Sequence, residues 1–315
     1  MSLPAIERFD AKLGKKRWLV TMEVNPPKGT DLSEILAAVK QVKGLVDAIN
    51  VTDGSGAIMR ACSLAVAKAV LDAGVDPILQ MTCRDRNRLA LQADLLGASI
   101  LGIRNVLLLT GDDPKAGDHP DAKPVFDINS AALMQVAKGL AEGHDMANKP
   151  LNGNPAFCIG AAADPGAKDL EVEMQKLKAK IDGGAAFFQT QAVFDPTRLR
   201  FFMERARPFG KPVLAGILLV KSAKMARYMN EHVWGIHVPE PLIERFERAN
   251  DAKAECIAVT AELIRSVRDF ADGIHLYALG WEALVPEILQ AAGITEGKSQ
   301  KEKVKTTRQN SKVSE

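Results

Sequence analysis

Short apolar runs alternate with longer amphipathic stretches along most of this chain. The runs have the length of single strands. The stretches between them repeat apolar residues every three or four positions, which is typical of helices packed on a sheet. The helix after the first run is expected to begin at a capping box formed by Asp31 and Glu34. Further helices are expected at residues 59–73 and 129–141 and from about Pro196. The eight expected strands are 18–24, 48–51, 77–81, 105–109, 156–159, 185–190, 212–217 and 273–277.

Strands that alternate with helices pair in parallel, and eight such units favour a closed barrel over an open sheet. The alternative, an open doubly wound sheet, would show a glycine-rich first turn, whereas residues 25–29 read Asn-Pro-Pro-Lys-Gly. We therefore expect an α/β fold in which residues 1–294 form a single (β/α)8 TIM barrel. Residues 295–315 carry almost no apolar side chain and are expected to form a disordered, charged C-terminal tail, with a weak electrostatic contact to a partner as the alternative.

The composition excludes some classes of protein. With 47% hydrophobic and 25% charged residues, the chain has the make-up of a soluble globular protein. A net charge of only +2 gives no broad basic field, so neither nucleic acid nor a membrane surface is expected as a partner. The apolar stretches are shorter than the roughly 20 residues that cross a bilayer, and residues 1–8 lack an apolar signal core. A cytoplasmic protein is expected.

The cysteines and histidines carry no metal or disulfide pattern. The four cysteines, Cys62, Cys83, Cys158 and Cys256, lie far apart and form no CxxC pair, so we interpret them as small buried residues. The five histidines show neither HxH nor HExxH spacing, and no metal site is predicted. The chain also lacks a P-loop, a GxGxxG motif and a GxSxG motif, which removes several common enzyme classes.

Polar residues follow most of the expected strands, and in a TIM barrel these strand ends form one rim that holds the active site. Glu23 interrupts the apolar run of the first strand. Because carboxylates are rarely buried without a partner, a carboxyl group there is expected to hold a proton that it can donate. The alternative is a strand-end glutamate paired with a basic residue such as Lys28.

Three other features lie on the same expected rim. Gly111, between Thr110 and Asp112, has no side chain to block the approach of a flat ring, although this is also a common turn sequence. Gln191 offers both a donor and an acceptor, as the edge of an amide-like heterocycle requires, although a strand-end glutamine is usually just solvated. The polar loop at residues 114–125 follows the fourth strand and is expected to be a binding loop.

Seven segments in order give the chain a resemblance to the methylenetetrahydrofolate reductase family up to about Ile294. Met-Glu-Val-Asn-Pro-Pro at residues 22–27 is similar to the Glu-Phe-x-Pro-Pro signature of that family, and Leu-Thr-Gly-Asp at 109–112 to its Leu-Arg-Gly-Asp motif. The remaining matches are residues 51–54, 80–85, 178–195, 216–218 and 276–277.

The resemblance implies a (β/α)8 barrel that binds FAD non-covalently. Hydride would pass from NAD(P)H through the flavin to 5,10-methylenetetrahydrofolate, which makes the chain a cytoplasmic enzyme of one-carbon metabolism and methionine biosynthesis. Glu23 matches the general acid that protonates N10. Asp112 matches the aspartate beside the flavin and pterin rings, and Gln191 matches the glutamine that binds the pterin edge. Lys180 would face the FAD diphosphate, with an exposed helix lysine as the alternative.

By this resemblance, the FAD-contacting positions are Thr52, Gln80, Thr110, Gly111, Asp112, Phe126, Ala162, Asp164, Glu173 and Lys180. The substrate-contacting positions are Glu23, Asp112, Gln191, Met225 and Met229.

Several of these residues depart from the family pattern. Gln80 stands where a histidine is common, Thr110 replaces an arginine, and Met225 and Met229 replace a glutamine and a phenylalanine around the stacked nicotinamide and folate. The electron donor therefore stays open between NAD(P)H and a small partner protein. A homo-oligomer, a flavin-free pterin-binding methyltransferase and a non-catalytic folate-binding barrel also stay open.

Overall fold

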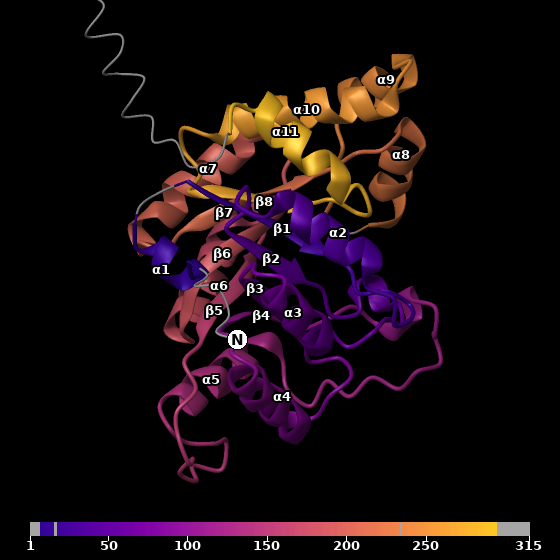
Figure 1. Cartoon of the computed structure of the whole chain (residues 1–315). Helices are drawn as coiled ribbons and strands as arrows, with labels where there is room; N and C mark the ends of the chain where they lie inside the picture. Colours follow the sequence, from indigo (N-terminus) through magenta and orange to yellow (C-terminus); the bar gives the residue numbers. More distant parts are fainter. Residues whose placement is uncertain (1–6, 16–17, 234, 295–315) are drawn as a thin grey trace, which may run out of the picture.

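The computed structural model describes residues 7–15, 18–233 and 235–294. Eight parallel strands form a closed barrel in which each strand pairs with the next and β8 pairs with β1 (Figure 1). The TIM barrel expected from the sequence is therefore confirmed, while the expected tail at 295–315 lies outside the described residues. The strands are β1 (Leu19–Val24), β2 (Ala48–Val51), β3 (Pro77–Thr82), β4 (Asn105–Leu109), β5 (Cys158–Ala163), β6 (Ala185–Ala192), β7 (Val213–Leu218) and β8 (Gly273–Tyr277).

Helices surround the barrel, and α10 with its neighbours α9 and α11 covers the side of β7, β8 and β1 (Figure 1). None of the helices in the described ranges has both the length and the apolar character needed to cross a membrane. The helices are α1 (Phe9–Leu13), α2 (Ser33–Val42), α3 (Ser63–Asp72), α4 (Arg88–Ile100), α5 (Ser130–Ala141), α6 (Leu170–Asp182), α7 (Pro196–Ala206), α8 (Ala223–His232), α9 (Glu240–Arg248), α10 (Ala252–Val267) and α11 (Val285–Ala291). Short 3-10 turns occur at Ser55–Ala57, Pro114–Ala116, Arg207–Phe209 and Glu282–Leu284.

Two local predictions were wrong. Helix α2 begins at Ser33, and its N-cap is Leu32, whose side chain makes no capping bond. Asp31 instead accepts the amide of Ser33 two residues on, at 2.9 Å, so there is no capping box with Glu34. Cys62 is exposed because α3 starts one residue after it, whereas the other three cysteines are buried as expected.

The lower half of the barrel interior, meaning the half at the N-terminal ends of the strands, is apolar and is closed by the short helix α1; the upper half lies at the C-terminal ends of the strands. Phe9 from this helix is fully buried, and its ring meets that of Phe187 edge to face at 5.1 Å. Gly160 makes room for Phe187, since a Cβ there would lie 2.3 Å from the end of the ring. The other residues of this cluster are Leu19, Ala48, Ile78, Leu107, Cys158 and Leu214.

Replacing Phe9 with alanine is expected to lower the free energy of unfolding by about 3–5 kcal/mol, because the ring fills a space that the surrounding strands cannot close. Phe201→Ala is the matched control, since that ring is 61% exposed. Denaturant midpoints of the two variants test this. Equal midpoints would show that α1 does not hold the base of the barrel.

Candidate functional site

Glu23 lies inside the barrel, near the end of β1 where the loops begin. Its side chain is 8% exposed, and its Oε2 atom is 3.7 Å from Nε2 of His275 on β8. The other ring nitrogen of His275 is 2.9 Å from the hydroxyl oxygen of Thr21. Lys28, the alternative partner of Glu23, forms an ion pair with Asp118 instead. The carboxyl group is therefore buried beside an imidazole.

A chain of hydrogen bonds continues from this histidine across the upper interior. The amide nitrogen of Gln189 donates to the hydroxyl of Thr21 at 3.0 Å and to the amide oxygen of Asn50 at 3.1 Å. Asn50 donates back to Gln189 at 2.7 Å. The network joins β1, β2, β6 and β8 and leaves Glu23 at its upper end.

Sequence reasoning did not identify Thr21, Asn50 or His275 as site residues. They carried a signal, because each is a polar residue inside an apolar strand, and Thr21 precedes Glu23 by two positions just as His275 precedes Tyr277. A period of two places both members of each pair on the same face of a strand.

The predicted residues at the ends of β2 and β3 are buried. Thr52 is almost fully buried and donates to the side chain of Asn25 at 2.8 Å. Gln80 is only 7% exposed. The structure thus places both at the upper end of the barrel, in the half that also holds Glu23 and its network.

The end of β4 requires glycine. Gly111 has a φ of +96°, and a Cβ there would lie 2.9 Å from Cβ of Thr82, so a side chain would be both strained and crowded. Thr110 bonds to the hydroxyl of Ser130 at 3.2 Å. Asp112 is exposed, and its Oδ2 atom accepts the amide of Gly56 at 2.9 Å.

The loop after β4 is tied to two neighbouring loops. Asp118 pairs with Lys28, accepts the amide of Met59 at 2.9 Å and contacts the ring of His119 at 3.0 Å. These partners, Lys28 first, hold the pKa of Asp118 well below its usual range. Phe126 lies further along this loop with a φ of +39° and 37% exposure.

A cavity of about 580 Å³ opens between the ends of β5 and β6 and helix α6. Lys180 projects into this region, and its ammonium group donates to the carbonyl of Ala162 at 2.6 Å. Burial lowers the pKa of Lys180, while the negative charge of Glu173 acts in the opposite direction. Five predicted residues therefore line one cavity: Ala162, Asp164, Glu173, Lys180 and Gln191.

Glu173 organises the back of this cavity. It is 3% exposed, one of its oxygens accepts the amide of Asp164 at 3.0 Å, and the other lies 3.6 Å from the ammonium group of Lys176. The lining of the cavity thus includes three lysines, Lys168, Lys176 and Lys180, and three carboxylates, Asp164, Asp169 and Glu173.

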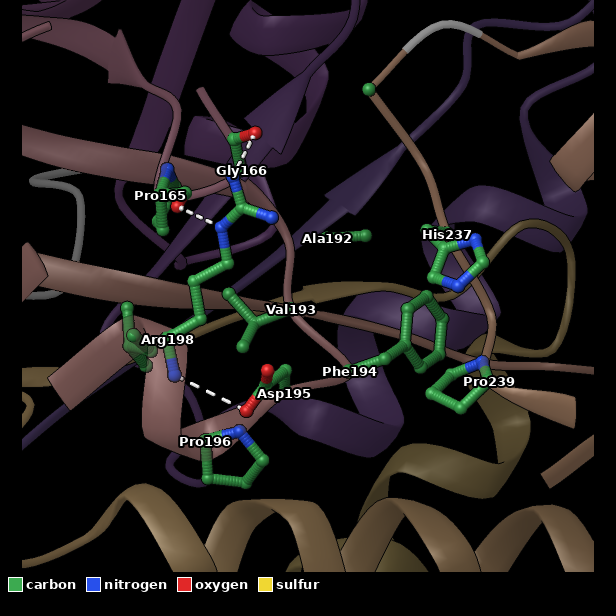
Figure 2. Close-up of a pocket in the computed structure, with 12 residues that line it drawn as sticks. Pro165, Gly166, Ala192, Val193, Phe194, Asp195, Pro196, Arg198, His237 and Pro239 are labelled. Atoms are coloured by element: carbon green, nitrogen blue, oxygen red, sulfur yellow. Dashed lines mark hydrogen bonds between the residues drawn. The ribbon is translucent and has the colours of Figure 1, made fainter. Parts of the chain in front are cut away.

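A second cavity of about 400 Å³ adjoins the first one and shares Gly166 and Gly235 with it. Arg198 supports its wall, because the guanidinium donates to the carbonyl groups of Pro165 at 3.0 Å and Gly166 at 2.7 Å (Figure 2). The ring of Phe194 lies beside His237 on the opposite wall (Figure 2).

The two methionines of α8 lie elsewhere. Met229 is 8% exposed and belongs to the hydrophobic core, and Met225 is partly buried against the same core. Neither lines the two cavities between β5, β6 and α6. Within the described ranges, no group of three or more His, Cys, Asp or Glu residues is arranged to hold a metal ion.

Comparison with known proteins shows the family of the chain. The family model described as methylenetetrahydrofolate reductase matches residues 8–293. The chain belongs to the methylenetetrahydrofolate reductase family. A relative from Caenorhabditis elegans, "Probable methylenetetrahydrofolate reductase (NADPH)", is 25% identical over 313 residues, which cover 91% of this chain and 44% of that protein. The "5,10-methylenetetrahydrofolate reductase" of Salmonella typhimurium is 24% identical over 292 residues and covers 88% of this chain and 92% of that protein.

The chain thus spans less than half the length of the family members from C. elegans and Schizosaccharomyces pombe, 44% and 47% respectively. Among solved structures, an oxaloacetate acetylhydrolase in complex with 3,3-difluorooxalacetate superimposes with a TM-score of 0.50 at 13% identity, covering 93% of this chain and 88% of that one. At this identity the likeness concerns the barrel fold alone.

Proposed function

We propose that this chain reduces 5,10-methylenetetrahydrofolate to 5-methyltetrahydrofolate with FAD as cofactor and NAD(P)H as electron donor. The observation that carries the proposal is a buried carboxyl group, Glu23, in the same barrel mouth as a cavity that gathers Gln191 and Lys180. Membership of the methylenetetrahydrofolate reductase family supports the same reaction.

The cavity beside β5 and α6 suits a dinucleotide. Lys180, with Lys168 and Lys176 on the same lining, would face the negatively charged diphosphate. Gly111, at the end of β4, would contact the flavin through its backbone. Thr52, Gln80, Thr110 and Phe126 would complete the FAD contacts. When bound, FAD supplies the hydride that reduces the folate.

Glu23 would act as the general acid. Its carboxyl group would transfer a proton to the bridging N10 of the folate. Protonation of N10 opens the five-membered ring to an electrophilic iminium ion. The network behind His275 would keep the carboxyl group in place while the substrate enters.

Gln191 and Asp112 would bind and orient the pterin. The Gln191 amide can donate to and accept from the edge of the ring, which presents both kinds of group. Asp112 already accepts the amide of Gly56 through one oxygen, so its other oxygen is free to receive ring N–H groups. Its negative charge would also act on the ring that carries the hydride.

The absorption spectrum of the purified protein tests the proposal first. A flavin spectrum is expected, and a colourless protein that binds no added FAD would favour a flavin-free methyltransferase or a folate-binding barrel. Anaerobic mixing with NADH or NADPH is then expected to bleach the flavin, and added methylenetetrahydrofolate to restore it. Bleaching by dithionite but by neither nucleotide, with folate still reduced, would point to a partner protein as electron donor.

Asp112→Asn is expected to raise the midpoint potential of the bound flavin, because a negative charge near the ring disfavours added electrons. It is also expected to weaken folate binding about tenfold, since a charged acceptor is lost. Potentiometric titration and folate binding measure the two effects, with Asp121→Asn on the exposed loop as the control. An unchanged potential would place Asp112 away from the flavin ring.

A further inference from the structure

Strand β6 contains a bulge where it pairs with β7. Gln189 stands opposite Leu214, but the next pair is Ala192 with Gly216. Two residues of β6, Thr190 and Gln191, therefore correspond to a single residue of β7. A bulge of this kind changes the direction of the side chains around it, and here Gln191 lines the cavity between β5 and α6.

Side chains, rather than the usual ladder, hold this bulge. The hydroxyl of Thr190 accepts the amide of Gly216 at 2.8 Å and donates to the carbonyl of Gln191 at 2.7 Å. The carbonyl of Thr190 in turn accepts the hydroxyl of Tyr277 at 2.7 Å. Both peptide units that flank the Cα of Gln191, the one before it and the one after it, are therefore held by hydrogen bonds.

Tyr277 reaches this carbonyl from β8, two strands away. The intervening strand carries Gly216, where a Cβ would lie 2.4 Å from the carbonyl oxygen of Thr190 and 2.8 Å from Cε2 of Tyr277. The ring can cross β7 only because this residue is glycine. It also packs edge to face against His275 at 4.6 Å, so one side chain touches both the bulge and the histidine beside Glu23.

We propose that Tyr277 is a positioning residue that holds the β6 bulge so that Gln191 faces the folate. This inference rests on the proposed function, since folate is the ligand that Gln191 would bind. The hydroxyl group keeps its proton and remains a donor, because burial raises the pKa of Tyr277.

Tyr277→Phe tests the inference, because it removes the hydroxyl and keeps the ring over Gly216. The Kd for 5-methyltetrahydrofolate, measured by calorimetry on the flavin-loaded protein, is expected to rise about tenfold, which is the usual effect of a lost buried hydrogen bond. The kcat at saturating folate is expected to change by less than about twofold, since Glu23 is untouched. Tyr228→Phe is the matched control on a ring that is 59% exposed.

A double-mutant cycle with Gln191→Ala separates positioning from a general loss of stability. If Tyr277 acts through Gln191, then Tyr277→Phe has almost no further effect on Kd once Gln191 is alanine. Additive losses in the double variant, or an unchanged Kd in Tyr277→Phe, would overturn the inference. A lack of folate binding by the unaltered protein would instead contradict the proposed function, and with it the ligand assigned to Gln191.

Discussion

Glu23→Gln is expected to slow the reduction of methylenetetrahydrofolate by about 10²–10⁴-fold, the range that a positioned general acid usually contributes. The amide has nearly the size and shape of the carboxyl group, so it fits the same space beside His275. It has no proton to give to N10, and the five-membered ring of the folate then stays closed. Stopped-flow oxidation of the prereduced flavin by methylenetetrahydrofolate measures this step in isolation.

The same variant should leave flavin content and the rate of flavin reduction by NAD(P)H unchanged, because neither process uses the proton of Glu23. Glu204→Gln is the control, an identical change on the exposed surface of α7. Normal turnover of the folate by Glu23→Gln would remove this residue from its proposed role. A loss of both half-reactions would show that the change had damaged the barrel mouth as a whole.

Lys180→Met is expected to weaken FAD binding by about 10–100-fold, since a hydrogen bond to a charged group contributes about 1.5–3 kcal/mol. Methionine keeps most of the length of the side chain and loses only the ammonium group. Lys178→Met provides a matched control two residues earlier on α6, where the lysine is exposed and pairs with Asp182 at 2.9 Å. Titration of the apoprotein with FAD, followed by flavin fluorescence, gives both affinities. Equal values would exclude a diphosphate contact.

The affinity for FAD should also depend on pH. Burial lowers the pKa of Lys180, so its positive charge is lost at a lower pH than for an ordinary lysine. FAD affinity is therefore expected to fall as the pH rises through that lowered pKa. Lys180→Arg should abolish this fall, because arginine stays charged throughout.

Much of the barrel was predictable because strands buried on both faces appear as apolar runs. The expected strands at 48–51, 105–109 and 273–277 match β2, β4 and β8 residue for residue. Strand β5 was less well predicted. It begins at Cys158 and continues through Ala163, and a run of glycine and alanine has no preference for extended structure. Gly160 makes room for the ring of Phe187, and this packing requirement cannot be read from local propensity.

The sequence identified some residues of the candidate site and missed others. Ala162, Asp164, Glu173, Lys180 and Gln191 line one cavity, and their roles as FAD or folate contacts stay predictions. Met229 was expected near the substrate and is buried in the core. The polar network beside Glu23 could not be predicted, because Gln189 and Asn50, which bond to each other in it, are 139 residues apart and meet only when the barrel closes. The β6 bulge depends likewise on a glycine one strand away and a tyrosine two strands away.

The two halves of the barrel interior differ in composition and in their expected roles. Phe9 and its apolar neighbours fill one end of the interior, while the hydrogen-bonded groups beside Glu23, where we propose the reaction takes place, fill the other. Substitutions in the apolar cluster around Phe9 are therefore expected to change thermal stability and to leave the proposed reaction unchanged. Substitutions meant to change the substrate are best confined to the barrel mouth, because the apolar cluster at the other end keeps the barrel folded.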